Sequence, residues 1–254
     1  MPVNLSHAYS QTTGTFFTSI HASMRDNHAA DDASPTLEEF ATWYRKRFEG
    51  ASPQAALDVG CGVNAYYARH CQEHGTSKVC ALDTNPEAVQ AIREDFPELD
   101  VTEGTVLELP FDDATFDLCI CAGVAHHTPD PERALREIHR VLKPGGVAYI
   151  TLYGFQGSLF EWIVRGWRLI GKIIPFSVGH FLFKRFPAIN NFVLDHSYAP
   201  ILWVFSRDEV LSMLTRIGFK ANDDWRGGID PTTDSWMGRV LSGDGLIRTF
   251  ICGR

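Results

Sequence analysis

The chain has 254 residues, a net charge of −8 and a hydrophobic fraction of 44%. The length accommodates one α/β domain with an insertion, and the apolar fraction is that of an ordinary globular protein. Because nucleic-acid-binding proteins usually carry a basic face, the charge argues against a nucleic-acid partner. The amino terminus lacks the basic start and apolar run of a signal peptide, so we expect a cytoplasmic protein.

Residues 1–50 are predicted to form an N-terminal segment that is partly helical and covers the core. Tyr9 lies in its polar first part and is a candidate to close over a bound ligand. Large apolar residues recur at helical spacing from Thr36 to Phe48, which predicts a helix there. Pro35 stands at its start, where proline is favoured.

The first predicted strand, Ala55 to Asp58, leads into a glycine turn, Gly60-Cys61-Gly62. Glycine allows the backbone to approach a ligand closely because it has no Cβ atom. A helix over Tyr66 to Glu73 follows, and a second strand runs from Lys78 to Asp83. An acid at a second strand tip, about 20 residues past a glycine turn, is well placed to hold a ribose diol.

Asp83 has an alternative interpretation as the N-cap of the next predicted helix, Pro86 to Phe96. Three further strands are predicted over residues 99–103, 116–122 and 147–152, with a helix over Glu132 to Val141. The strand at 116–122 is almost continuously apolar, which is typical of a strand covered on both faces. Strands alternating with helices predict a doubly wound parallel sheet.

The six cysteines form no C-x-x-C pair. Cys119 and Cys121 alternate along a predicted strand, so they share one face of it and are expected to pack rather than bind a metal. We therefore expect buried, reduced thiols and no metal site.

Residues 155–205 depart from this pattern, since they are rich in tryptophan, phenylalanine and isoleucine. We predict a mainly helical insertion that caps the active site, although a dimer interface or a helix on a membrane surface through residues 155–190 is also compatible. The longest uncharged run, Ile173 to Phe183, is too short to span a membrane. The basic residues interleaved with the aromatic ones are Arg165, Arg168, Lys172, Lys184 and Arg185.

The core pattern resumes at Ser206-Arg207-Asp208-Glu209, which predicts a capping box and a helix that ends at Gly218. Two last strands are predicted over residues 219–225 and 246–252. The expected divisions of the chain are 1–50 as cover, 51–154 as cofactor-binding core, 155–205 as insertion and 206–254 as the rest of the core sheet.

Two classes of cofactor compete for the glycine turn. The pattern Gly60-x-Gly62-x-x-Ala65 fits the dinucleotide fingerprint, with Asp83 as the ribose acid. However, Asp58 precedes the first glycine by two residues. A carboxylate there would repel a pyrophosphate and would suit a cationic group, such as the amino group of S-adenosylmethionine.

Three more segments follow the glycine turn: LPFDDATFD at 109–117, HHTPDP at 126–131 and RVLKPGG at 140–146. In this order and spacing the four motifs closely resemble class I S-adenosylmethionine-dependent methyltransferases, in the small-molecule branch that includes ubiquinone/menaquinone-type enzymes. The resemblance covers residues 52–153. It implies a seven-stranded Rossmann-like sheet with an antiparallel last strand. It also implies S-adenosyl-L-methionine as cofactor, with S-adenosyl-L-homocysteine as product.

The resemblance also implies a set of cofactor contacts, all expected at the carboxyl ends of strands, as are the motif segments themselves. Asp58 would face the amino group directly or through water, and Asp83 would accept hydrogen bonds from both ribose hydroxyls. The other implied contacts are Gly60, Cys61 and Gly62 on the methionine part, Thr84 and Asn85 along the adenine, and Cys121, Ala122 and Gly123 near the sulfonium.

Two positions depart from the family pattern. Asn64 stands where many relatives have glycine, and we expect it to keep the turn because asparagine tolerates a left-handed backbone. Thr105 stands where many relatives have an acid that contacts the adenine amine. Its hydroxyl can still accept that bond, or backbone contacts of Val106 can carry the adenine instead.

Methyl transfer is an in-line displacement on an activated sulfonium, so the protein has mainly to align the acceptor and exclude water. His126 and His127 follow the strand at 116–122 and are candidates for contacting acceptor or cofactor, or for fixing the loop only. The polar cluster Asp195, His196 and Tyr198 lies within the apolar insertion. It either faces the acceptor or closes a loop by hydrogen bonds.

We therefore expect a methyltransferase, a monomer or a homodimer, that acts on a small or medium, partly apolar acceptor. Within enzymes, the alternatives are a lipid or quinone methyltransferase at the membrane surface and a nicotinamide oxidoreductase. A third alternative is a catalytically silent cofactor-binding or partner protein, which would bind S-adenosylmethionine without turnover.

Overall fold

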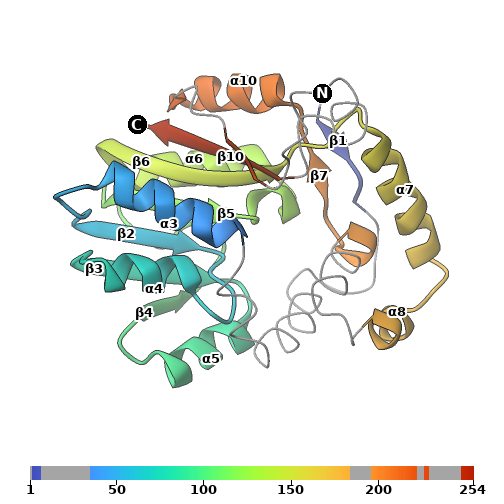
Figure 1. The fold of residues 1–254 in the computed structure, drawn as a ribbon, viewed down its shortest axis with the longest axis horizontal. Coiled ribbons are helices and arrows are strands. Elements are labelled where there is room, and N and C mark those ends of the chain that lie inside the picture. The colour runs from blue at the N-terminus through green and yellow to red at the C-terminus, as the bar shows by residue number, and fades with distance from the viewer. Residues whose placement is uncertain (1, 7–34, 184–195, 222–225, 229–246) are drawn as a thin grey trace.

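A central eight-stranded sheet organises the chain, as seen in a computed structural model that describes residues 2–6, 35–183, 196–221, 226–228 and 247–254 (Figure 1). The strand order is β4-β3-β2-β5-β6-β10-β8, and β9 pairs with β10 beside this path. The strands are β2 (Ala55–Val59), β3 (Lys78–Asp83), β4 (Asp100–Glu103), β5 (Phe116–Ala122), β6 (Leu142–Tyr153), β8 (Lys220–Ala221), β9 (Arg226–Gly228) and β10 (Ile247–Gly253).

Five strands, β2 to β6, run parallel, whereas β10 runs antiparallel to β6, β8 and β9. This confirms the doubly wound sheet with an antiparallel last strand. The predicted count of seven strands is wrong by one, because β9 is additional. The Arg-Gly-Gly sequence of β9 has no alternating apolar pattern, and the strand exists through its pairing with β10.

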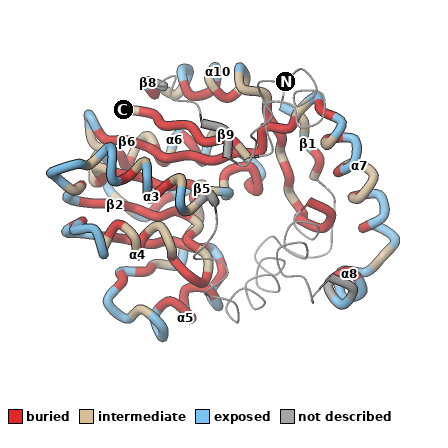
Figure 2. The backbone as a smooth tube through the Cα atoms, in the orientation of Figure 1, coloured by how far each residue is buried: buried red, intermediate tan, exposed pale blue. Residues whose placement is uncertain are grey.

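Helices cover both faces of the sheet, so its strands are buried on both sides (Figures 1 and 2). Helices α3 (Pro35–Arg47), α4 (Tyr66–Glu73) and α5 (Pro86–Asp95) pack on one face through a core that includes Phe40 and Tyr149. Helices α6 (Pro131–Val141) and α10 (Arg207–Ile217) pack on the other. These five helices begin and end within one residue of the predicted positions.

Helix caps account for several of the motifs. The predicted capping box at Ser206 and Glu209 is present, and Gly218 ends α10 in a left-handed conformation. The N-cap of α5 is Asn85, whose side chain accepts a hydrogen bond from the Glu87 N–H at 3.0 Å. The alternative interpretation of Asp83 as this cap is therefore wrong, and its carboxylate is available for another role.

The segments 109–117 and 140–146 lie at the amino ends of β5 and β6, not at carboxyl ends as we expected. Arg140 explains their position, because its guanidinium donates to the carbonyl oxygens of Leu109 at 2.9 Å and Phe111 at 2.8 Å. The Lys143 Nζ lies 3.0 Å from Asp117 Oδ2, which also accepts from the Ala55 N–H. These motifs brace the end of the sheet at which β5 and β6 begin.

The insertion begins with α7 (Leu159–Gly171) and α8 (Phe176–Phe183), on the side toward which β6 runs (Figure 1). It ends in β7 (Trp203–Val204), which pairs antiparallel with β1 (Val3–Asn4) in a separate two-stranded sheet. The start of the chain is thereby fastened to the insertion. None of the helices in the described ranges combines the length and apolar character needed to cross a membrane.

Arg168 holds this part of the molecule together. From the sequence we grouped it with basic residues compatible with a membrane-surface helix, but Arg168 is only 1% exposed. Its guanidinium donates to the carbonyl oxygens of Leu5 at 2.6 Å, His196 at 3.0 Å and Ala199 at 2.7 Å. Three segments distant in sequence meet at this one side chain, which explains why periodicity along a single helix did not identify it.

We expect Arg168→Leu to lower the free energy of unfolding by about 3 kcal/mol or more, because three buried carbonyl oxygens lose charged donors. Denaturant unfolding measures the change. Lys172→Leu is the matched control, since Lys172 is exposed on the next turn and its loss should change stability by less than about 0.5 kcal/mol. Equal effects of the two substitutions would contradict this account of Arg168.

Candidate functional site

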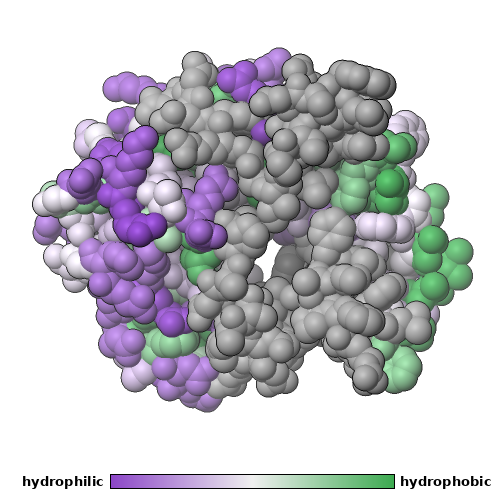
Figure 3. All heavy atoms as spheres, in the orientation of Figure 1, coloured by the Kyte–Doolittle hydropathy of each residue, from purple (hydrophilic) through white to green (hydrophobic). Residues whose placement is uncertain are grey.

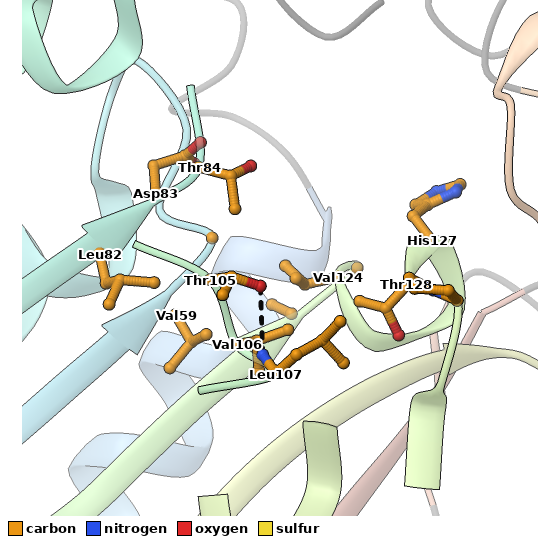
Figure 4. A pocket seen from close by; sticks show the side chains of 14 residues that line it. Val59, Leu82, Asp83, Thr84, Thr105, Val106, Leu107, Val124, His127 and Thr128 are labelled. Atoms are coloured by element: carbon orange, nitrogen blue, oxygen red, sulfur yellow. Dashed lines mark hydrogen bonds between the residues drawn. The ribbon is translucent and has the colours of Figure 1, made fainter. Parts of the chain in front are cut away.

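A cavity of about 400 Å³ opens at the carboxyl ends of the parallel strands (Figure 4). Residues from β2, β3 and β5, and from the loops that follow β2, β3, β4 and β5, line it. Its walls are mostly apolar, as is typical of a small-molecule site. The lining residues are Val59, Gly60, Leu82, Asp83, Thr84, Thr105, Val106, Leu107, Ala122, Gly123, Val124, His127, Thr128 and Pro129.

Asp83 is the carboxylate of this cavity. It is 7% exposed, and its two oxygens accept hydrogen bonds from the N–H groups of Gly62 and Asn85, each at 2.9 Å. The side chain is therefore fixed between the loops after β2 and β3. Because an ionised carboxylate offers about four acceptor positions, it retains capacity for donors from a ligand.

Asp58 lies behind the glycine turn and is not part of the cavity lining. Its carboxylate is 2% exposed and accepts a hydrogen bond from the Ala68 N–H at 3.1 Å. That N–H belongs to the first turn of α4, where backbone donors lack helical partners. Burial raises the pKa of Asp58 to about 7, and the charge of Asp83 contributes to the rise. A cation near this turn would favour the ionised form.

The glycine turn is packed against the loop after β5. Gly60 has a φ of +70°, and a Cβ atom there would lie 2.4 Å from Val124 Cγ2. Glycine is thus required at this position by packing within the protein as well as by backbone conformation. We expected only the approach of a ligand to require it, since contacts between the loops after β2 and β5 cannot be read from the sequence.

Asn64 does not adopt the left-handed backbone by which we expected it to keep the turn. Among the described residues other than glycine, only Ala65 and Ala114 have positive φ values, and the value for Ala65 is 42°. Ala65 directly precedes α4, so the left-handed residue stands one position after the position that we predicted. Asn64 is buried, and its side-chain amide donates to the Tyr66 hydroxyl at 2.9 Å.

Thr105 and Val106 both line the cavity, in the loop after β4. The Thr105 hydroxyl accepts a hydrogen bond from the Leu107 N–H at 3.2 Å, which closes a tight turn (Figure 4). A hydroxyl oxygen has a second lone pair, so this bond leaves Thr105 able to accept once more. Asp83 and Thr84 lie toward one side of the cavity and His127 toward the other (Figure 4).

His126 and His127 form a short 3₁₀ helix with Ala125. His127 lines the cavity, and its Nδ1 lies 2.8 Å from the carbonyl oxygen of Ile201. Since a carbonyl oxygen only accepts, Nδ1 carries the proton. His126 is 1% exposed, and neither of its ring nitrogens has a hydrogen-bond partner.

The His126 ring packs against the rings of Tyr153 and His127, at centroid distances of 4.1 and 4.3 Å. Burial, with smaller contributions from His127 and His196, holds its pKa well below the usual value. His126 is therefore a neutral imidazole directly behind the cavity wall.

Several predicted site residues do not line the cavity. His196 is buried among aromatic rings, with Tyr153 at 4.9 Å, and the Tyr198 hydroxyl donates to the carbonyl oxygen of Ile174 at 3.1 Å. Cys61 and Cys121 are buried in the two cores on opposite faces of the sheet. Tyr9 and Asp195 lie outside the described residues.

The sequence interpretation missed six lining residues. Thr128 and Pro129 stand within the HHTPDP segment, so their position next to His127 was the signal that could have identified them. The other four are apolar residues beside named ones, and no polar group distinguishes them from core residues. They are Val59, Leu82, Leu107 and Val124.

Comparison with known proteins identifies the region that contains this site. The family described as "Methyltransferase domain" matches residues 57–150. A demethylmenaquinone methyltransferase from Chlorobaculum tepidum is 35% identical over 106 residues, which cover 42% of this chain and 43% of that relative. The chain thus matches about half the length of its curated relatives.

Solved structures share the fold over nearly the whole chain. A methyltransferase from Haloferax volcanii, in complex with the Trm112 methyltransferase activator, is similar with a TM-score of 0.64 and 19% identity, over 95% of this chain and 97% of that one. The 1,6-didemethyltoxoflavin-N1-methyltransferase of Burkholderia thailandensis, with bound S-adenosylhomocysteine, gives a TM-score of 0.58 and 15% identity. That match covers 100% of this chain and 96% of the other.

We expect Gly60→Ala to destabilise the protein by about 3 kcal/mol, from left-handed strain in alanine and overlap with Val124. Val124→Ala in the same chain should recover the part due to overlap, since it removes the two nearest carbon atoms. Denaturant unfolding of both single variants and the double variant measures the coupling. Strict additivity of the two changes would contradict the packing argument.

Proposed function

Because the chain belongs to the class I S-adenosylmethionine-dependent methyltransferases, with the family domain over residues 57–150, we propose that it transfers a methyl group to a small or medium, partly apolar acceptor. The observation that carries the proposal is the pair of buried carboxylates, Asp58 and Asp83, on either side of one glycine turn. The bound cofactor would supply a methyl group already activated on a sulfonium.

The sheet topology favours this function over a nicotinamide oxidoreductase. Dinucleotide-binding domains have a mostly parallel sheet with the usual strand order 3-2-1-4-5-6. In this chain the antiparallel β10 stands between β6 and β8. A pyrophosphate would also meet the carboxylate of Asp58 near the glycine turn, whereas a ligand with an ammonium group and a ribose diol would use both Asp58 and Asp83.

The residues of the cavity fit such a ligand. Asp83 would accept hydrogen bonds from the ribose hydroxyls, on oxygens that are already oriented by Gly62 and Asn85. Gly123 has no atom within 4 Å of a virtual Cβ, so a ligand can approach its backbone closely. Thr84, Thr105 and Val106 would flank the adenine.

Asp58 would act on the ammonium group of the cofactor through the glycine turn, by charge and through water rather than as part of the cavity wall. A fixed negative charge there favours a cation and disfavours a phosphate.

The acceptor would occupy the part of the cavity lined by Leu107, Val124 and His127. His127 would orient it, because the bond from Nδ1–H to Ile201 fixes the ring. His126 supports this role by packing directly against it, as a neutral ring. The apolar residues would exclude water from the in-line displacement.

Calorimetric titration of S-adenosylhomocysteine, with NAD as a parallel ligand, tests the proposal. Micromolar or tighter binding of S-adenosylhomocysteine alone is expected. Transfer of a radiolabelled methyl group to extracted small molecules then tests turnover. Binding of NAD alone would overturn the proposal, and tight binding without any methyl transfer would favour a silent cofactor-binding protein.

Asp83→Ala is expected to weaken S-adenosylhomocysteine binding by about tenfold or more, because each charge-assisted hydrogen bond contributes about 1.5–3 kcal/mol. Glu103→Ala is the matched control, since Glu103 is an exposed acid opposite Asp83 on the neighbouring strand β4. Its affinity should not change. Unfolding midpoints of both variants identify any loss of affinity that comes from misfolding.

Binding of S-adenosylhomocysteine at pH 6 is expected to release a proton. Asp58, with a pKa of about 7, is mostly protonated in the free protein and ionises beside the ammonium group. Affinity should therefore rise with pH up to about 7 and then level off. Calorimetry in buffers of different ionisation enthalpy counts the proton, and Asp58→Asn should abolish its release. Identical heats in all buffers for the unaltered protein would contradict this assignment.

A further inference from the structure

Helix α7 presents an apolar surface to solvent. All of its exposed residues are apolar, and they recur along one side of the helix. The row continues past the helix through Ile173, which is 83% exposed, and onto α8 with Phe181, which is 65% exposed. We call this row the α7 ridge, and it consists of Leu159, Trp162, Ile163, Leu169, Ile170, Ile173, Val178 and Phe181.

The inward side of α7 carries the charges instead. Glu161 is 5% exposed and accepts hydrogen bonds from the Gly157 N–H at 2.7 Å and from Arg165 Nε at 2.8 Å. Arg168 lies on the same side and binds three backbone carbonyl oxygens. These contacts fix the rotation of the helix, so the outward position of Trp162 follows from the polar contacts on the opposite side.

The ridge is the main apolar surface of the described structure. Within the described ranges, every large apolar side chain that is strongly exposed lies between Leu159 and Phe181. Figure 3 shows hydrophobic residues, in green, on the side of the molecule where Figure 1 draws α7 and α8. Contiguous apolar surface of this kind marks a site that another surface covers.

The charges around the ridge favour an anionic partner. Residues 155–183 contain one acid, the buried Glu161, and three basic residues, of which Arg168 is also buried, whereas the whole chain has a net charge of −8. Lys172 is exposed at the end of α7, and the Arg165 guanidinium lies 5.5 Å from the centre of the Trp162 ring. Tryptophan with adjacent basic residues on an amphipathic helix is the composition of a membrane-surface helix.

We propose that the α7 ridge lies in the interface of an anionic lipid bilayer, parallel to its plane. A second copy of the chain fits the ridge less well. A two-fold interface would bring together two segments that each carry three basic residues and one acid, so their net positive charges would repel. Anionic headgroups would instead neutralise the exposed Lys172. The proposal concerns binding alone and does not depend on methyl transfer.

Sedimentation with phosphatidylcholine vesicles, with and without about one third phosphatidylserine, tests the proposal. The protein should sediment with the anionic vesicles at low salt and less well as salt rises. Trp162→Glu combined with Ile173→Glu should reduce the bound fraction about tenfold or more. Lys172→Gln should weaken binding to the anionic vesicles while leaving any binding to phosphatidylcholine unchanged.

The matched control carries the same two added charges far from the ridge, as Gln90→Glu with Ser212→Glu on exposed positions of α5 and α10. It should bind vesicles like the unaltered protein. Unfolding midpoints verify that each variant is folded. The proposal is overturned if the unaltered protein stays in the supernatant, or if the ridge variant binds as well as the control. It is also overturned if light scattering finds a dimer that the ridge variant loses while vesicles bind neither protein.

Discussion

The carboxylate of Asp83 is the interaction on which the candidate site depends. It accepts the N–H of Gly62 from the loop after β2 and the N–H of Asn85 from the loop after β3. Asn85 in turn caps α5, so one side chain sets the glycine turn, the start of a helix and one side of the cavity. A ligand that binds Asp83 would therefore bind a group that the fold has already oriented, which lowers the entropy cost of binding.

Asp58 likewise combines a contact within the protein with a proposed role toward the ligand, but its pKa is raised. Its carboxylate accepts a hydrogen bond from a backbone N–H in the first turn of α4, where the N-cap residue Ala65 has no side chain that could accept it. Its burial disfavours the ionised form, and the nearby charge of Asp83 adds to this effect. The carboxylates of Asp58 and Asp83 repel each other electrostatically in the free protein, and a bound cation would compensate for this repulsion. The electrostatic cost in the free state is thus a source of selectivity for a cationic ligand over an anionic one.

Periodicity predicted the sheet and the helices that cover it because those elements depend on contacts that repeat along the sequence. The acid at the strand tip and the resemblance to the methyltransferase family, rather than periodicity, singled out Asp83, Thr105 and His127, and all three line the cavity at the carboxyl ends of the strands. Periodicity could not predict the contact of Gly60 with Val124, because that contact joins loops separated by more than 60 residues. The same limit applies to Arg168, whose acceptors come from Leu5, His196 and Ala199.

Helix α7 illustrates a different limit. A hydrophobic pattern indicates that a helix has two unlike sides, but it does not indicate which side faces the protein. In α7 the buried side carries Glu161 and Arg168 beside Val164, since both charged side chains have hydrogen-bond partners inside the molecule, and Trp162 lies on the exposed side. The charged side is satisfied inside the molecule, and the apolar side is left without cover in the described structure. The orientation of α7 leaves its apolar side exposed to water, which is unfavourable for the protein in solution. An apolar surface such as a bilayer would remove this exposure by covering the ridge.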